Sequence, residues 1–299
     1  MALHKPPSGA KVKDTDALSD SPKTPGSGNS PKGMPEFVQR TLGGIVVVGG
    51  IVGGIFIGGW VWPLVASTIA LGSLWELYML MSSKYKISRG WGLLGGLLML
   101  VSISIGLSYA VTLSILTVVG FLVLFTEVVR RQSTGQSFAL WNLGGTLSGL
   151  VYVVLPWSFM ILIRTQTWGH IFLLTLFACT WSCDVGAYLI GSKFGATPFC
   201  PRVSPKKTWE GFWAGVAFST ICGSGLAVLF EFPPLPLLLL GLLCGVAGQI
   251  GDLGESVLKR EAHVKDSGKA IPGHGGFLDR FDSILINASL AFFIFEVIG

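Results

Sequence analysis

Charged residues are scarce in this sequence. Only 12% of its 299 residues are Asp, Glu, Lys or Arg, whereas 51% are hydrophobic. Ordinary soluble domains carry about 25% charged residues, so this composition excludes a typical soluble fold. The five cysteines are scattered and show neither a zinc-ligand spacing nor a disulfide framework, so we read them as small buried side chains. The sequence also lacks a Walker-type GxxxxGK[ST] motif.

Long apolar runs are abundant instead. A helix needs about 20 apolar residues to cross a bilayer, and hydrocarbon cannot satisfy an open sheet edge. The runs that meet this requirement are roughly 41–59, 61–81, 91–109, 111–129, 138–163, 168–190, 211–230, 234–254 and 283–298. They predict an all-α, polytopic integral membrane protein, a bundle of about nine transmembrane helices.

The distribution of lysine and arginine predicts the orientation. If the N-terminus is cytoplasmic, every basic residue except Arg164 falls in the tail or in a cytoplasmic loop, and the C-terminus lies on the far side. The net charge of +5 then faces anionic lipid, and it needs no nucleic acid to explain it. Tryptophans near span ends are expected to anchor the interface; these are Trp60, Trp62, Trp91, Trp157 and Trp168.

Residues 1–36 differ from the rest of the chain, because they are rich in Pro, Gly, Ser and charge. Such a segment cannot bury enough apolar surface to offset the entropy of ordering, so it predicts a disordered cytoplasmic tail. It contains no apolar core that precedes a small-residue cleavage site, so we expect no removed signal peptide. The transmembrane domain is then residues 37–299.

Charge is concentrated in one late segment, Gly251 to Asp282, between two apolar runs. Asp252, Glu255 and Lys259 are spaced to share one helix face, and Asp279 and Asp282 are likewise three residues apart. We expect the acids of both helix ends to meet in one cytoplasmic pocket. Mg²⁺ typically binds one or two carboxylates together with substrate phosphates, so these acids are candidate ligands. A solvated acidic surface is the alternative.

Groups suited to phosphate surround these acids. The glycines of "PGHGG" can bring backbone N–H groups close to an anion, and His274 stands between them. The cations that can offset phosphate charge there are Lys259, Arg260, Lys265, Lys269 and Arg280. His263 reads as an exposed loop residue.

An earlier loop, "PRVSPKKTWEGFW", adds Lys206 and Lys207. The same stretch also reads as an ordinary helix entry, capped by Thr208 or Ser204.

Acids inside apolar runs are functional candidates because their insertion costs about 2.5–3.5 kcal/mol. Asp184 lies well inside the sixth run, and Glu76 is evenly balanced between a site role and a structural one. Glu127, followed by Arg130 and Arg131, is expected to reach the surface. Two function classes remain open, phosphoryl or nucleotidyl transfer to a lipid and ion transport. The polar residues gather at one rim rather than at mid-membrane, which favours the enzyme.

The stretch "SVLKREAHVKDSGKAIPGHGGFLDRFD", Ser256 to Asp282, resembles the signature of the phosphatidate cytidylyltransferases, the CDP-diacylglycerol synthases. "DVGAYLIGSKFG", "SPKKTWEG" and "GDLGES" resemble the companion motifs of that family, in its order. The resemblance covers about residues 37–299. It disfavours a CTP-dependent lipid kinase, and a CDP-alcohol phosphotransferase would need a DGxxAR-type motif that the sequence lacks.

The resemblance implies an enzyme that joins CTP and phosphatidic acid into CDP-diacylglycerol and releases pyrophosphate. It also implies a homodimer. The position of the polar residues predicts a cytoplasmic-side active site in residues 37–299, and we expect a bacterial-type plasma membrane. Asp252 and Asp279 are the implied holders of Mg²⁺ and of a second, monovalent cation such as K⁺, and Glu255 and Asp282 are further candidate ligands. The expected catalytic residues besides these two acids are Lys259, Arg260, Arg280 and His274. The expected substrate-binding residues are Asp184, Ser204, Lys206, Lys207, Lys265, Asp266, Gly275 and Gly276.

Overall fold

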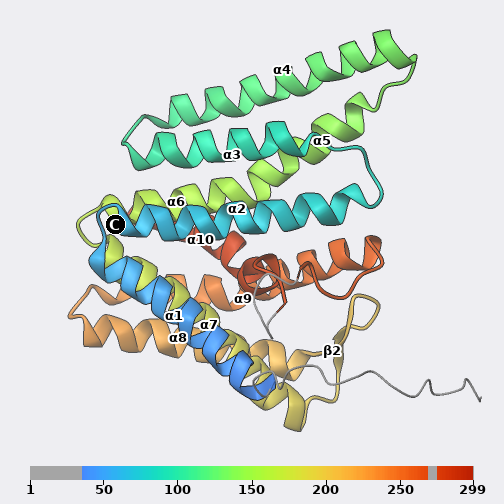
Figure 1. The fold of residues 1–299 in the computed structure, drawn as a ribbon. Helices are drawn as coiled ribbons and strands as arrows, with labels where there is room; N and C mark the ends of the chain where they lie inside the picture. The colour runs from blue at the N-terminus through green and yellow to red at the C-terminus, as the bar shows by residue number, and fades with distance from the viewer. Residues whose placement is uncertain (1–35, 269–274, 299) are drawn as a thin grey trace, which may run out of the picture. The chain divides into compact units, whose positions relative to one another are not determined.

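The computed structural model describes residues 36–268 and 275–298, most of which lie in helices (Figure 1). The first helices are α1 (Glu36–Ile57), α2 (Val61–Ser82), α3 (Arg89–Ser104), α4 (Tyr109–Thr134) and α5 (Ala139–Gly149). A π-helical turn, η1 (Leu150–Val154), joins α5 to α6 (Leu155–Thr165). The remaining elements are α7 (Gly169–Phe194), β1 (Pro198–Cys200), β2 (Ser204–Thr208), α8 (Trp209–Leu229), α9 (Pro234–Glu261) and α10 (Leu278–Ile298).

Each predicted apolar run coincides with a helix, and α5, η1 and α6 form one continuous helical segment over the fifth run. Six helical segments are long and apolar enough to cross a membrane. They are Val61–Ser82, Tyr109–Thr134, Ala139–Thr165, Gly169–Phe194, Trp209–Leu229 and Pro234–Glu261. Two further apolar helices are shorter, Thr41–Ile57 and Arg89–Ser104. The helical membrane-protein class is therefore supported, and the count of nine spans stays a prediction.

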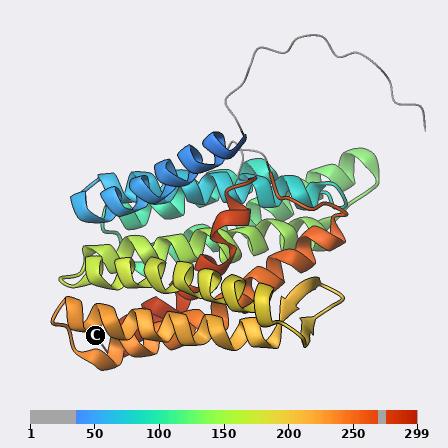
Figure 2. The same ribbon diagram turned by 90° about the horizontal axis from the view of Figure 1, so that it is seen from below.

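The later helices form the part of the bundle that positions the site. Helices α7, α8 and α9 pack side by side, and α10 crosses between α9 and α6 (Figures 1 and 2). Polar bonds tie them together: Ser219 Oγ of α8 donates to the Gly241 carbonyl of α9 at 2.7 Å. Asn287 Nδ2 of α10 donates to Thr180 Oγ1 of α7 at 2.9 Å. Such bonds hold helices in apolar surroundings, where little else distinguishes a neighbouring helix from lipid.

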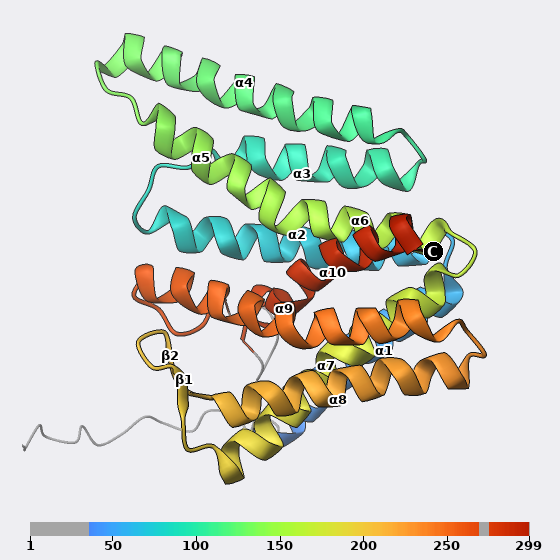
Figure 3. The same ribbon diagram turned by 180° about the vertical axis from the view of Figure 1, so that it is seen from behind.

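A two-stranded antiparallel hairpin, β1 and β2, connects α7 to α8 and corrects the all-α expectation (Figure 3). The hairpin is possible because the segment lies between two apolar helices and not within one. The Trp209 N–H bonds the Thr197 carbonyl at 2.9 Å, which closes the hairpin against the start of α8. Thr208 Oγ1 accepts from the Gly211 N–H at 3.3 Å, so the predicted Thr208 cap is confirmed.

Two predicted interface tryptophans are buried instead. Trp62 and Trp157 are both 0% exposed, and Trp62 Nε1 donates to the Met160 carbonyl at 3.1 Å. Trp157 packs edge-on against Phe281 of α10. Nearness to a span end did not identify the helix face on which each ring lies. Trp60 and Trp168 are exposed, as expected.

The expectation for Glu127 is also wrong, because its side chain is buried in α4. It accepts hydrogen bonds from the Phe138 N–H and from Asn142 Nδ2, each at 2.7 Å, and pairs with Arg130. The carboxylate thus fastens α4 to the start of α5. It is a structural acid, since the Phe138 N–H, Asn142 and Arg130 all bind it. The expectation that most cysteines are buried is confirmed for Cys179, Cys183 and Cys244.

Candidate functional site

A cavity of about 490 Å³ lies between α7, β2, α8 and α9. Four of the predicted site residues line it: Asp184 from α7, Lys206 and Lys207 from β2, and Asp252 from α9. Its volume is within the range typical of small-molecule sites. The hairpin that the sequence did not predict is what brings the two lysines to the acids. In Figure 3 the hairpin and the last turns of α9 lie at the same end of the helices.

Lys207 and Asp252 make the principal ion pair of this cavity, with Nζ and Oδ2 2.7 Å apart. Their side chains are 24% and 38% exposed, so both stay accessible to a ligand. Lys207 Nζ also lies 3.4 Å from the carbonyl of Gln249, one turn before Asp252. A half-exposed pair of this kind contributes little to stability, which leaves the lysine available to bind an anion.

Two further carboxylates lie near this pair. Asp184 and Asp282 interact electrostatically with Asp252 and with each other, and Lys207 and Arg280 partly offset the charge around Asp184. Within residues 36–268 and 275–298, no group of three His, Cys, Asp or Glu side chains forms a complete metal site. Mg²⁺ does not require one, because it keeps several waters and takes one or two carboxylates plus substrate phosphates. Asp252 lines the cavity and can therefore supply one such carboxylate beside the phosphates of a substrate.

A second charged cluster is formed by Glu255 and Lys259 of α9 and Asp279 of α10. Lys259 Nζ is 2.6 Å from Glu255 Oε2 and 2.8 Å from Asp279 Oδ1. Glu255 is fully buried, and only 15% of the Lys259 side chain is exposed. The shared-face prediction for α9 thus holds for Glu255 and Lys259, whereas Asp252 turns towards Lys207. The end of α9 and the start of α10 therefore meet, as predicted, and Lys259 joins them.

Asp279 is surrounded by donors. Besides Lys259 on Oδ1, its Oδ2 accepts from the Ser267 N–H at 2.9 Å, from Ser267 Oγ at 3.0 Å and from the Gly276 N–H at 3.0 Å. Hydrogen bonds to the ionised form favour the carboxylate. Both oxygens are engaged, so Asp279 holds Ser267 and Gly276 to the start of α10. The Gly276 N–H, expected to bind substrate, serves this carboxylate.

Glu76 of α2 joins the same cluster. Its side chain is 5% exposed, and its Oε2 accepts from the Leu278 N–H at 2.9 Å and from Ser267 Oγ at 3.1 Å. The sequence did not decide between a site role and a structural role for Glu76. Its partners, Ser267 and Leu278, lie 191 and 202 positions further along the chain.

Of the other predicted residues, Arg260, Lys265, Asp266 and Arg280 are exposed, and Ser204 is partly buried in β2. Gly275 adopts a left-handed φ of 87°, which suits its place before the start of α10. His263 is exposed, as expected, and His274 lies outside the described residues.

Gln249 is a site residue that the sequence reasoning missed. Its Nε2 donates to the Gly245 carbonyl at 2.7 Å and to the Phe212 carbonyl at 3.1 Å, which ties α9 to α8 beneath the cavity. Its position three residues before Asp252, on the same helix face, was the available signal.

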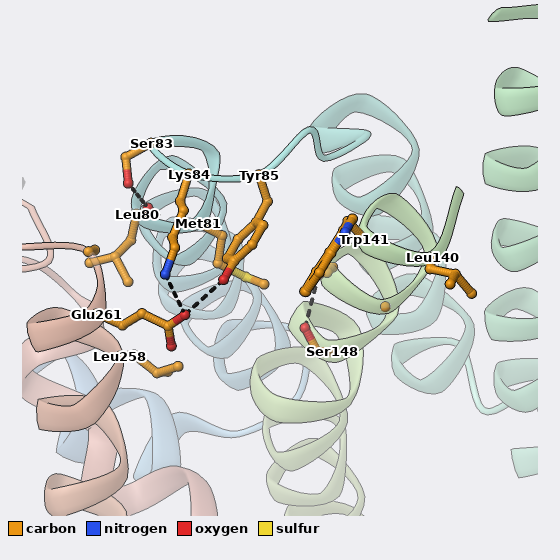
Figure 4. A pocket seen from close by; sticks show the side chains of 13 residues that line it. Leu80, Met81, Ser83, Lys84, Tyr85, Leu140, Trp141, Ser148, Leu258 and Glu261 are labelled. Atoms are coloured by element: carbon orange, nitrogen blue, oxygen red, sulfur yellow. Dashed lines mark hydrogen bonds and ion pairs between the residues drawn. The ribbon is translucent and has the colours of Figure 1, made fainter. Parts of the chain in front are cut away.

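A larger cavity, of about 580 Å³, lies between the ends of α2 and α9 and the start of α5 (Figure 4). Lys84 and Tyr85 both point to Glu261, with Nζ–Oε1 and Oη–Oε1 distances of 3.1 and 2.8 Å. The hydrogen bond to Glu261 raises the pKa of Lys84. The Tyr85 ring stacks on Trp141 at 4.9 Å. The larger cavity offers one lysine, which already pairs with Glu261. The smaller cavity offers two lysines beside two carboxylates, so it is the better candidate for a polyanion that binds together with a cation.

Comparisons with known proteins identify the family of this chain. Residues 38–298 match the model of the "Cytidylyltransferase family". The chain is 37% identical over 180 residues to the phosphatidate cytidylyltransferase of Bacillus subtilis. The aligned region covers 58% of this chain and 64% of the relative. It is 42% identical over 138 residues to that of Synechocystis sp., covering 43% of this chain and 47% of the relative. For the Rickettsia bellii protein of the same name, the identity is 34% over 160 residues, covering 50% of this chain and 68% of the relative.

The matched regions thus span about two thirds or less of the first two relatives. The family model, by contrast, covers nearly all of the part of the chain that the structure describes. On this match, the chain belongs to the cytidylyltransferase family.

Proposed function

We propose that this protein is a CTP:phosphatidate cytidylyltransferase, a membrane enzyme that makes CDP-diacylglycerol and pyrophosphate. The observation that carries the proposal is the cavity of about 490 Å³ in which Lys206 and Lys207 face Asp184 and Asp252. Cations beside carboxylates suit a nucleoside triphosphate bound with Mg²⁺. The relatives named phosphatidate cytidylyltransferase support the choice of substrates.

In the proposed reaction, a phosphate oxygen of phosphatidic acid attacks the α-phosphorus of CTP. The new P–O bond forms as the bond from the α-phosphorus to the bridging oxygen of the β-phosphate breaks, and pyrophosphate leaves with that electron pair. A phosphomonoester has a second pKa near 6, so the attacking oxygen is largely ionised at pH 7 and needs no general base. The main tasks are to bring two polyanions together in line and to stabilise the leaving group.

The residues divide these tasks. Lys206 and Lys207 bind the CTP phosphates, and Lys207 exchanges its contact with Asp252 for one with phosphate. Asp252 and Asp282 would hold Mg²⁺, which when bound neutralises charge on the phosphates. Arg280, near the start of α10, would bind the phosphate of phosphatidic acid, and its exposure supports this role. Lys259 holds Glu255 and Asp279 and so keeps the two helix ends together.

The membrane arrangement belongs to the same proposal. The distribution of basic residues supports a cytoplasmic N-terminus, a C-terminus on the far side and a cytoplasmic reaction site. The bacterial relatives support a bacterial-type plasma membrane. A homodimer and a monovalent cation such as K⁺ rest on the family resemblance, and so does the proposed contribution of His274.

A labelled-substrate assay tests the proposal. Purified protein in detergent micelles receives phosphatidic acid, Mg²⁺ and CTP labelled at the α-phosphate. We expect label in the lipid phase, loss of that label in Asp252→Asn, and retention in Glu261→Gln, which changes the carboxylate of the other cavity. Label that enters lipid only from γ-labelled CTP would indicate a lipid kinase. No transfer from either nucleotide would overturn the enzyme proposal and favour transport.

A further inference from the structure

The carboxylate of Glu76 caps a helix that follows it by about 200 residues. Leu278 is the first residue of α10, and the first N–H groups of a helix have no acceptor within it. Glu76 Oε2 supplies that acceptor at 2.9 Å, from a side chain that is only 5% exposed in α2. The start of α10 is therefore fixed by α2.

The backbone at Gly268 and at Gly276 lies close to this carboxylate. A Cβ atom added at Gly268 would lie 2.3 Å from Glu76 Oε1, and one added at Gly276 would lie 2.3 Å from Oε2. Real Cβ contacts are not this short, so glycine at these two positions is what allows the approach. Glu76 Oε1 is buried and has no hydrogen-bond partner among the described residues.

Ser267 links Glu76 to the proposed reaction site. Its Oγ lies 3.1 Å from Glu76 Oε2 and 3.0 Å from Asp279 Oδ2. A hydroxyl has one proton and can donate to one of these oxygens at a time, so the serine is shared by both carboxylates. Asp279 in turn binds Lys259 at 2.8 Å. A continuous polar chain therefore runs from α2 through Ser267 and Asp279 to α9.

We propose that Glu76 is a positioning residue for the transfer reaction. By holding Ser267 and the start of α10, it fixes the positions of Asp279 and Lys259 relative to the cavity. Burial of a carboxylate with an unbonded oxygen is costly, and a role in holding the site explains its presence better than stability does. A misplacement of about 1 Å near reacting groups can cost 100-fold in rate. The inference rests on the proposed function, which it deepens.

Substitutions of Glu76 test the inference through the split between kcat and KM. Glu76→Ala should lower kcat by about 100-fold and change the KM for CTP less than threefold, because the lysines that bind CTP lie elsewhere. Glu76→Gln keeps the size and one acceptor oxygen, so it should retain a rate between those of wild type and Glu76→Ala. Gly276→Ala should resemble Glu76→Ala.

Two matched controls accompany these variants. Glu261→Gln removes an exposed carboxylate at the end of α9, and Gly254→Ala adds a methyl group where there is open space. Both should keep the wild-type kcat. Combining Glu76→Ala with Ser267→Ala should cost less than the product of the single effects, since the two residues act as one unit.

Amide hydrogen exchange gives a readout that does not depend on activity. In Glu76→Ala the Leu278 amide should lose protection, while amides in the middle of α8 should exchange as in the wild type. Wild-type kcat in folded Glu76→Ala, or unchanged protection at Leu278, would overturn the inference. If Glu76→Ala does not fold, Gly276→Ala decides by the same two criteria. If wild-type protein transfers no label, the proposed function fails, whereas exchange at Leu278 still tests whether Glu76 holds α10.

Discussion

Replacement of Lys259 by methionine should destabilise the protein strongly, because this lysine is the shared partner of two buried acids. Its Nζ lies 2.6 Å from Glu255 and 2.8 Å from Asp279, whose side chains are 0% and 8% exposed. Removing one partner of a buried ion pair leaves charge uncompensated and typically costs about 3–5 kcal/mol. We expect a loss of that size in the free energy of unfolding for Lys259→Met.

The matched control is Lys84→Met, which breaks a pair of similar geometry in open surroundings. Lys84 and Glu261 are 3.1 Å apart, but their side chains are 52% and 48% exposed. Solvent screens such a pair, so its loss should leave the free energy of unfolding nearly unchanged. The measurement is a titration of both variants with SDS in mixed micelles, followed through the fluorescence of the ten tryptophans.

The burial argument also predicts a rescue. Adding Glu255→Gln to Lys259→Met removes one of the two uncompensated carboxylates, so the double variant should be more stable than Lys259→Met alone. Equal losses in Lys259→Met and Lys84→Met would refute the reasoning, because the two pairs differ chiefly in burial. A double variant less stable than Lys259→Met would refute it as well.

Three further outcomes are expected. Glu127→Gln should lower the free energy of unfolding by about 1–3 kcal/mol, measured in the same micelles, because the buried carboxylate accepts from the Phe138 N–H and Asn142. An unchanged stability would contradict the structural role of Glu127. Asp252→Asn should reduce turnover at least 100-fold, measured as label transfer, and a rate within threefold of wild type would exclude Asp252 from the reaction. Chelation of divalent cations by EDTA should stop transfer and added Mg²⁺ should restore it; full activity in EDTA would remove the metal from the mechanism.

Much of the helical organisation could be predicted from the sequence, because an apolar run of about 20 residues has few alternatives to a membrane helix. The sequence also identified Asp184, Lys206, Lys207 and Asp252, which the structure brings into one cavity. Their signals were local: acids within or beside apolar runs, and a pair of lysines beside a helix entry.

What could not be predicted depended on the packing between distant segments. The burial of Trp62 and Glu127 follows from which helix face meets a neighbouring helix. An apolar run of about 20 residues does not encode that face. The hairpin is set by a few contacts, such as the Thr197 carbonyl with the Trp209 N–H. Glu76 could not be assigned, because its partners arrive from a loop and helix near the other end of the chain.

Equilibrium binding of CTP tests most directly the claim that the cavity between β2, α7, α8 and α9 is the nucleotide site. The measurement compares wild type, Lys207→Met and Lys84→Met by calorimetry in micelles with Mg²⁺. We predict that Lys207→Met raises the Kd for CTP at least tenfold, since each lysine on a phosphate typically contributes a charge-assisted bond, while Lys84→Met leaves the Kd unchanged. A Kd that rises in Lys84→Met and stays constant in Lys207→Met would place the nucleotide in the other cavity and contradict the assignment.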